Sequence, residues 1–221
     1  MTDPPNVGVY LETGGKRVFA CALDWPGWCR SAKDEEQALH ALDGYRARYA
    51  EVAKEAGVPF PADAGLDVVE RLPGSAGTDF GVPGAVAQHD LAPLPRGESE
   101  RLTALLEASW RILDRAAAGS PAELRKGPRG GGRDRDAIVE HVLAAEAAYV
   151  RKIGLRLAQP DPRDGDAVAE FRRAVAARLR VESDGGPLAE KGWPARYAFR
   201  RFAWHVLDHA WEIQDRNPAP A

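Results

Sequence analysis

The spacing of hydrophobic residues changes partway along the chain, from a strand pattern to a helical one. Near the N-terminus, VGVYLE and RVFACALD are rich in β-forming residues and flank TGGK, whose glycines suit a tight hairpin turn. A break at WPGW and a helical segment follow, and LDVVERL predicts a returning strand. Residues 1–75 are therefore predicted to form a small α+β module of ββ(β)αβ order.

The helical segment of this module, residues 31–57, carries its own start and stop signals. Ser31 or Asp34 is the expected N-cap, and Gly57 is the expected stop. Between them, apolar side chains recur at helical spacing, at Ala38, Leu42, Tyr45 and Tyr49. The module contains no cluster of catalytic residue types.

Beyond the module, glycine and proline interrupt any regular element over residues 76–95, which are predicted to be a linker. The remaining segment, 96–221, has a helical period. It predicts four helices, at 98–117, 134–157, 166–180 and 194–216. Short connections between them favour a four-helix bundle. The predicted fold class is thus α+β with two domains, a small N-terminal module followed by an all-α bundle.

Composition and charge narrow the classes of partner. The net charge of the 221 residues is −3, with an acidic excess in residues 1–95 and a basic excess in 96–221, and neither part concentrates basic residues as nucleic-acid binders do. No run approaches the roughly 18 apolar residues of a membrane span, and no signal-peptide layout is present. We expect a cytoplasmic protein with no nucleic-acid and no membrane partner.

The two cysteines of the chain, Cys21 and Cys29, have no cysteine or histidine partners at metal-ligand spacing. The sequence predicts reduced, structural thiols.

Histidines supply the candidate chemistry. In AWHVLDHAWEIQDR, His205 and His209 are four residues apart, so both imidazoles leave one side of the predicted helix, at the margin of its apolar face. His141 lies at the margin of the apolar face of the helix at 134–157. Three neutral imidazoles from two helices can bind a divalent metal and leave a coordination position open. The sequence predicts a metal site at His141, His205 and His209.

The alternative is that these histidines are ordinary helical side chains. A single histidine on a helix is more often hydrogen-bonded or solvated than bound to metal, and HxxxH lacks the glutamate of HExxH. The other two histidines, His40 and His89, are expected to face solvent.

Several charged residues could support such a site. Glu146 falls within the apolar face of its helix, and a buried carboxylate needs a partner, either an imidazole as support of the metal ligands or an arginine. Asp208 and Glu212 flank the histidines and are expected to form surface pairs, although either could orient an imidazole. In GPRGGGRDR, which lacks the ending of a phosphate-binding loop, Arg129 or Arg133 could meet an anionic substrate or simply be solvated.

Trp204 and Trp211 are seven residues apart on the same side of the last predicted helix, away from the histidines. They are expected to pack against the first module or against a second subunit, in which case a homodimer would form.

The segments GPRGGGRDRDAIVEHVLAAEAAYVRKIG and RFAWHVLDHAWEIQDR resemble the DinB-like superfamily of four-helix metal-binding proteins, over residues 96–221. The resemblance implies that His141, His205 and His209 bind one divalent metal, zinc or nickel. It also implies a thiol-dependent S-transferase or isomerase that uses a low-molecular-weight thiol of the mycothiol or bacillithiol type and a small electrophile.

The segment VFACALDWPGWCRSAKDEEQALHAL resembles the HicB-like family, over residues 5–73. That family pairs with a small RNase toxin and usually carries a DNA-binding tail, which is not found after the module here. A packing or dimerisation role is therefore expected for these residues. The alternatives to an enzyme are a non-catalytic, metal-stabilised bundle and a HicB-like partner-binding protein.

Overall fold

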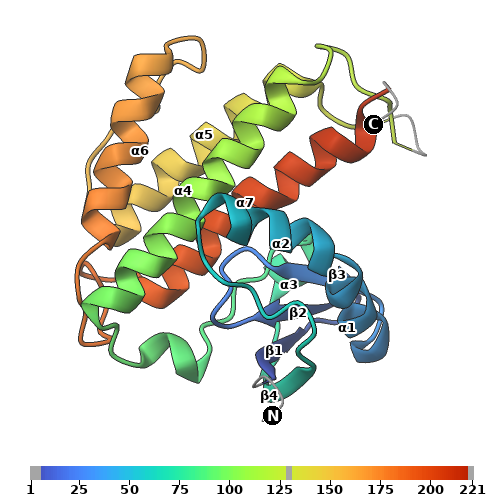
Figure 1. Ribbon diagram of the computed structural model, residues 1–221, viewed down its shortest axis with the longest axis vertical. Helices are drawn as coiled ribbons and strands as arrows, with labels where there is room; N and C mark the ends of the chain where they lie inside the picture. Colours follow the sequence, from blue (N-terminus) through green and yellow to red (C-terminus); the bar gives the residue numbers. More distant parts are fainter. Residues whose placement is uncertain (1–5, 128–130, 219–221) are drawn as a thin grey trace.

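The computed structural model describes residues 6–127 and 131–218 and shows an α+β protein (Figure 1). A four-stranded sheet with three short α-helices lies on one side, and the long helices lie on the other. The helix α7 runs between the two parts (Figure 1). The elements in order are β1 Val7–Thr13, β2 Val18–Ala22, β3 Cys29–Ala32, α1 Glu35–Gly44, α2 Arg46–Glu55, β4 Leu66–Pro73, α3 Ala76–Phe80, η1 Gln88–Leu91, α4 Arg96–Ala118, α5 Arg135–Tyr149, η2 Val150–Ile153, α6 Gly165–Leu179 and α7 Ala195–Arg216.

The sheet has the strand order β3-β2-β1-β4. β1 and β2 form an antiparallel hairpin, β3 pairs antiparallel with β2, and β4 returns parallel to β1. The predicted order of elements is confirmed, including the third strand after WPGW.

The first predicted helix is divided into two. Asp34 caps α1 by accepting a hydrogen bond from the backbone N–H of Gln37 at 2.8 Å, and the chain leaves helical geometry at Tyr45 before α2 begins. The side chains of Leu42 and Tyr49 are fully buried. The break at Tyr45 lets both short helices place apolar residues in the core.

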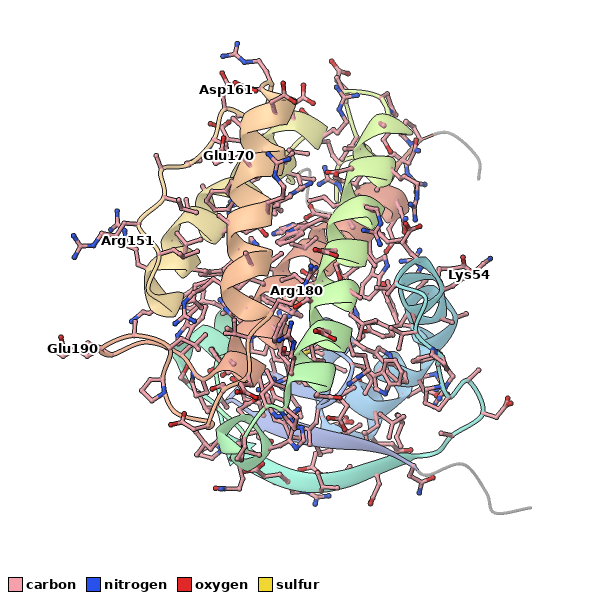
Figure 2. The ribbon with its side chains drawn as sticks, turned by 60° about the vertical axis from the view of Figure 1, so that its left-hand side comes forward. Lys54, Arg151, Asp161, Glu170, Arg180 and Glu190 are labelled. Carbon is pink, nitrogen blue, oxygen red and sulfur yellow. A yellow bond between two sulfur atoms is a disulfide. The ribbon has the colours of Figure 1, made fainter. Side chains whose placement is uncertain are left out.

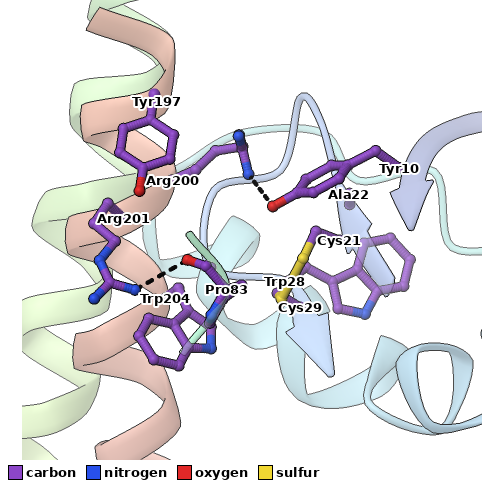
Figure 3. Close-up of a pocket in the computed structure, with 11 residues that line it drawn as sticks. Tyr10, Cys21, Ala22, Trp28, Cys29, Pro83, Tyr197, Arg200, Arg201 and Trp204 are labelled. Carbon is purple, nitrogen blue, oxygen red and sulfur yellow. Dashed lines mark hydrogen bonds between the residues drawn. A yellow bond between two sulfur atoms is a disulfide. The ribbon is translucent and has the colours of Figure 1, made fainter. Parts of the chain in front are cut away.

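The sheet places Cys21 and Cys29 opposite each other. They are register partners on β2 and β3, with their Cα atoms 4.1 Å apart, and the structure joins them as a disulfide (Figure 3). The prediction of reduced thiols is wrong, because the two residues lie in separate strands that the tertiary pairing brings together.

Residues 76–95 are packed closely onto the sheet. The carboxylate of Glu12 on β1 is fully buried and accepts hydrogen bonds from the backbone N–H groups of Gly84 and Ala85 at 3.0 and 2.9 Å. The short elements α3 and η1 lie within this segment. Buried hydrogen bonds of this kind hold the predicted linker in one place.

In the helical part, α7 packs against α4 over much of its length and also against α5, whereas α6 packs chiefly against α4 and η2. The predicted boundaries hold except at 134–157. There α5 ends at Tyr149, and η2 and then Gly154, with φ of 83°, follow. The side chains of Arg151 and Glu190, labelled in Figure 2, point away from the body of the protein.

One hydrophobic core extends through both parts and includes side chains of the sheet, α4 and α7. Arg30 of β3 donates a hydrogen bond to the carboxylate of Asp208 on α7 at 2.9 Å. Arg200 of α7 donates to the hydroxyl of Tyr10 at 2.7 Å in a buried contact, next to a cavity of about 10 Å³ (Figure 3). The sheet therefore packs closely against α7, the helix that carries His205 and His209.

Candidate metal centre

The three histidines singled out in the sequence meet between α5 and α7. His141 lies on α5, and His205 and His209 lie one turn apart on α7. A nitrogen atom from each can be chosen so that all three lie within 4.8 Å of one another. The Nε2 atoms of His205 and His141 are 3.3 Å apart. The packing of α5 against α7 thus brings all three predicted histidines together.

Burial disfavours the protonated form of two of the three histidines, His205 and His141. His205 is 6% exposed, and His141 and His209 are half-buried. Burial lowers the pKa of His205 well below its ordinary range, and the neighbouring His209 and His141 lower it further. Burial also lowers the pKa of His141, with His209 as the next cause. Neutral imidazoles are the form that binds metal.

A carboxylate supports one of the imidazoles from outside the cluster. The Nδ1 atom of His209 lies 2.8 Å from a carboxylate oxygen of Glu212. The other oxygen of Glu212 accepts a hydrogen bond from Arg216 at 2.6 Å, and Arg216 also donates to the backbone carbonyl of Arg125 at 2.8 Å. The hydrogen bond with His209 is the main cause that lowers the pKa of Glu212. A charged carboxylate on Nδ1 leaves Nε2 of His209 available to a ligand.

Glu146 occupies a different environment from the histidines. Its side chain is fully buried and accepts a hydrogen bond from the indole N–H of Trp110 on α4 at 2.6 Å. Its second oxygen has no hydrogen-bond partner among the described residues. Burial raises the pKa of Glu146 to about 7. The carboxylate that contacts an imidazole of the cluster is therefore Glu212, one of the two residues, with Asp208, that the sequence offered for orienting an imidazole.

The donor set fits a divalent metal ion. Two nitrogens bound at about 2.0–2.1 Å to a tetrahedral ion lie about 3.3 Å apart, which is the separation of the His205 and His141 Nε2 atoms. The Nδ1 atom of His205 is buried without a hydrogen-bond partner among the described residues, so no hydrogen bond at Nδ1 commits this ring to one tautomer. Three imidazoles and one supporting carboxylate are typical of sites for zinc and related ions.

The remaining sequence predictions are resolved in different ways. Trp204 packs edge-to-face on Phe19 of the sheet, and Trp211 packs on Tyr45, so the prediction that these tryptophans contact the first module is confirmed. His40 is exposed as predicted.

His89 was predicted to face solvent, but it is half-buried and its Nε2 lies 2.9 Å from the carboxylate of Asp24. Arg133 is exposed and near enough to lower the pKa of His141 and His205, whereas Arg129 lies outside the described residues.

Comparisons with models of known families, with curated proteins and with solved structures give no match for this chain. The resemblances to the DinB-like and HicB-like families therefore stay predictions, and the interpretation of the centre depends on its geometry. None of the helices within residues 6–127 and 131–218 combines the length and apolarity needed to cross a lipid bilayer.

Proposed function

We propose that this protein binds one divalent metal ion, zinc or nickel, through His141, His205 and His209. The observation that carries the proposal is the convergence of these three imidazoles from two helices within 4.8 Å. Glu212 supports it as the hydrogen-bond partner of His209. Solvated histidines, the alternative, would have no reason to gather around one point with one of them buried.

We further propose that α4, α5, α6 and α7 are a four-helix bundle of the DinB-like kind and that the centre serves thiol chemistry, as an S-transferase or isomerase. The support is the resemblance of residues 96–221 and the partial exposure of His141 and His209, which leaves one side of the centre open to a small molecule. A bound divalent cation would lower the pKa of a thiol that meets it and so supply a nucleophile near neutral pH.

Within this scheme the chain's own residues have separate tasks. The three imidazoles hold the ion, and Glu212 fixes the orientation of His209. The buried contacts of Trp204 and Arg200 with the sheet hold α7 in place. The N-terminal module then acts as a rigid support for the helix that carries two of the three ligands.

Metal content tests the first proposal. Protein purified without a histidine tag should take up one zinc or nickel ion per chain, measured by elemental analysis after equilibrium dialysis. His205→Ala should abolish this uptake, and His40→Ala, which changes an exposed histidine, should leave it unchanged. Uptake far below one ion per chain, or uptake that His205→Ala does not alter, would contradict a three-histidine site.

Activity is a separate question. The zinc- or nickel-loaded protein should accelerate the conjugation of mycothiol or bacillithiol to small electrophiles, and His205→Ala should remove that acceleration. If the loaded protein accelerates none of a broad panel, a non-catalytic, metal-stabilised bundle becomes the better description. The HicB-like alternative predicts a protein partner or a homodimer formed through residues 5–73, which co-purification with the full chain would show.

A further inference from the structure

One arginine beside the metal centre has no carboxylate partner. Three of the four arginines of α7 are paired with acidic residues: Arg196 with Glu98, Arg200 with Asp90, and Arg216 with Glu212. For the fourth, Arg201, no carboxylate within residues 6–127 and 131–218 lies at ion-pair distance. Arg201 is half-buried. A cation partly removed from water without a counter-charge is costly, and an anion from outside the chain would offset that cost.

The guanidinium of Arg201 is nevertheless held firmly. It donates one hydrogen bond to the hydroxyl of Tyr149 at 3.0 Å and another to the backbone carbonyl of Pro83 at 3.0 Å. It lies 4.8 Å from the centroid of the Trp204 ring. Figure 3 shows these two side chains and the hydrogen bond from Arg201 to Pro83. A guanidinium has five N–H donors, and none of the others on Arg201 is buried without a partner. The group is therefore fixed in place with donors still available.

Arg201 lies close to the histidine cluster along α7. Arg201 precedes His205 by one turn of α7, which is a rise of about 6 Å. On α5, Tyr149 follows His141 by two turns, and its ring centroid is 5.9 Å from that of His205. The pair formed by Arg201 and Tyr149 thus lies next to the metal centre along the contact of the two helices.

The residues between the pair and the centre are partly exposed. Ala145 stands between His141 and Tyr149 on α5, and its methyl group fills little space. These three residues, together with Arg201 and His209, are half-buried, whereas neighbouring positions of both helices such as 142, 143, 206 and 207 are fully buried. A small molecule from solvent can therefore reach this stretch.

The charge of the stretch is positive. Glu212, the carboxylate at the histidine cluster, is already paired with His209 and Arg216, whereas Arg201 has no carboxylate at ion-pair distance among the described residues. The hydroxyl hydrogen of Tyr149 has no acceptor among the described residues, so the phenol can donate a hydrogen bond beside the guanidinium. One positive charge and two adjacent donor groups, the guanidinium and the phenol, match a carboxylate, whereas a phosphate dianion would need further compensation.

We propose that Arg201 and the hydroxyl of Tyr149 bind the carboxylate of a small-molecule ligand whose other end meets the three-histidine cluster. This inference rests on the proposed metal site. Because one helical turn separates Arg201 from His205, thiol acids with two or three carbon atoms between the thiol and the carboxylate are suitable probes.

Full-length protein loaded with cobalt(II), which reports thiolate ligation by its absorption spectrum, tests the inference. We expect mercaptobutyrate or mercaptopropionate to bind roughly 10 to 100 times more tightly than the uncharged mercaptopropanol, because a charge-assisted hydrogen bond contributes that factor. Arg201→Gln should remove at least a tenfold part of this preference without changing cobalt content or the affinity for mercaptopropanol. Arg151→Gln, which changes an exposed arginine, should leave both affinities unchanged (Figure 2).

Tyr149→Phe provides a second variant, which keeps the ring and removes only the hydroxyl, and should reduce the preference several-fold. Equal affinities for the acids and the alcohol in the unaltered protein would overturn the inference and leave the metal proposal intact. The inference is also overturned if Arg201→Gln keeps the full preference for the acids, because chelation of the metal by thiol and carboxylate together would then explain that preference. Failure of the unaltered protein to take up cobalt would overturn both.

Discussion

Glu212 and His209 form a hydrogen-bonded pair at the edge of the histidine cluster, with 2.8 Å between the carboxylate oxygen and Nδ1 of the ring. Because Arg216 binds the other oxygen of Glu212, the carboxylate is fixed from both sides. This arrangement directs Nε2 of His209 away from Glu212 and makes Glu212 a positioning residue for the proposed metal.

Glu212→Gln should therefore weaken metal binding. Loss of a supporting carboxylate typically costs about 10- to 100-fold in metal affinity, because the imidazole loses both its orientation and part of its basicity. Zinc affinity measured by competition with a chromophoric chelator checks this. Glu170→Gln, on the exposed side of α6, is the control and should keep the original affinity. An affinity unchanged in Glu212→Gln would mean that Glu212 is only a surface partner of Arg216.

The metal-free protein should lose stability as pH falls below about 6.5. His205 has a pKa well below its ordinary value in the folded state because it is buried. In this range the unfolded chain binds a proton at His205 and the folded chain does not, so acid favours unfolding by up to about 1.4 kcal/mol per pH unit. Urea unfolding with a chelator present, at pH 7 and pH 5, measures the change.

Two variants isolate the contribution of His205 from that of other groups. His205→Gln should show a smaller loss between pH 7 and pH 5 than the unaltered protein, since the titrating group is gone. His40→Gln should show the same loss as the unaltered protein, because His40 is exposed. If His205→Gln and the unaltered protein lose the same free energy of unfolding, burial of a neutral His205 is not the cause.

Glu146 should make the opposite contribution. Burial raises its pKa to about 7, above the ordinary value of 4.5, so the folded state holds a proton that the unfolded state has released between these two values. Its contribution to stability is complete below pH 4.5 and is lost as pH rises through 7, by about 3 kcal/mol at most.

Glu146→Gln, which stays uncharged and can still accept from Trp110, should be more stable than the unaltered protein at pH 8 and should gain little at pH 5. Urea unfolding at the two pH values measures the difference. Glu140→Gln changes an exposed residue of the same helix and should show no such pH-dependent gain. A gain of equal size at both pH values would show that ionisation of Glu146 is not involved.

The contact between the WPGW turn and α7 predicts a sharp difference between two glycines. Gly27 has φ of 92°, and a Cβ atom there would lie 3.0 Å from the carbonyl oxygen of Ala203 and 2.5 Å from Leu207. Gly27→Ala should therefore lower the free energy of unfolding by about 1–3 kcal/mol or more. The added Cβ would strain the backbone at positive φ and would collide with α7.

Gly44→Ala is the matched substitution at a glycine with no heavy atom within 4 Å of its added Cβ. It should leave the free energy of unfolding unchanged or raise it by less than about 1 kcal/mol. Thermal or urea unfolding of the two variants makes the comparison. Equal effects of the two substitutions would mean that the turn does not approach α7 as closely as the structure shows.

The local pattern of the sequence determined much of this protein. Alternation and turn residues located the strands, and the helical period located α4, α6 and α7 to within two residues at each end. The spacing of His205 and His209 placed both on one side of α7, and that of His141 placed it at the edge of the apolar face of its own helix. These properties depend on each segment alone, since the periods of strand and helix decide where a side chain points.

Tertiary structure decided what each side chain meets. Periodicity determines on which side of its own helix a side chain lies, but it does not determine which helix packs against that side. The contact of His141 with His205 therefore required the packing of α5 on α7. The same reason separates Glu146, which Trp110 binds, from the histidines, and joins Cys21 to Cys29 across two strands. Arg201 stands beside the histidines without a carboxylate among the described residues because packing, not spacing, assigned the available acids to the other arginines of α7.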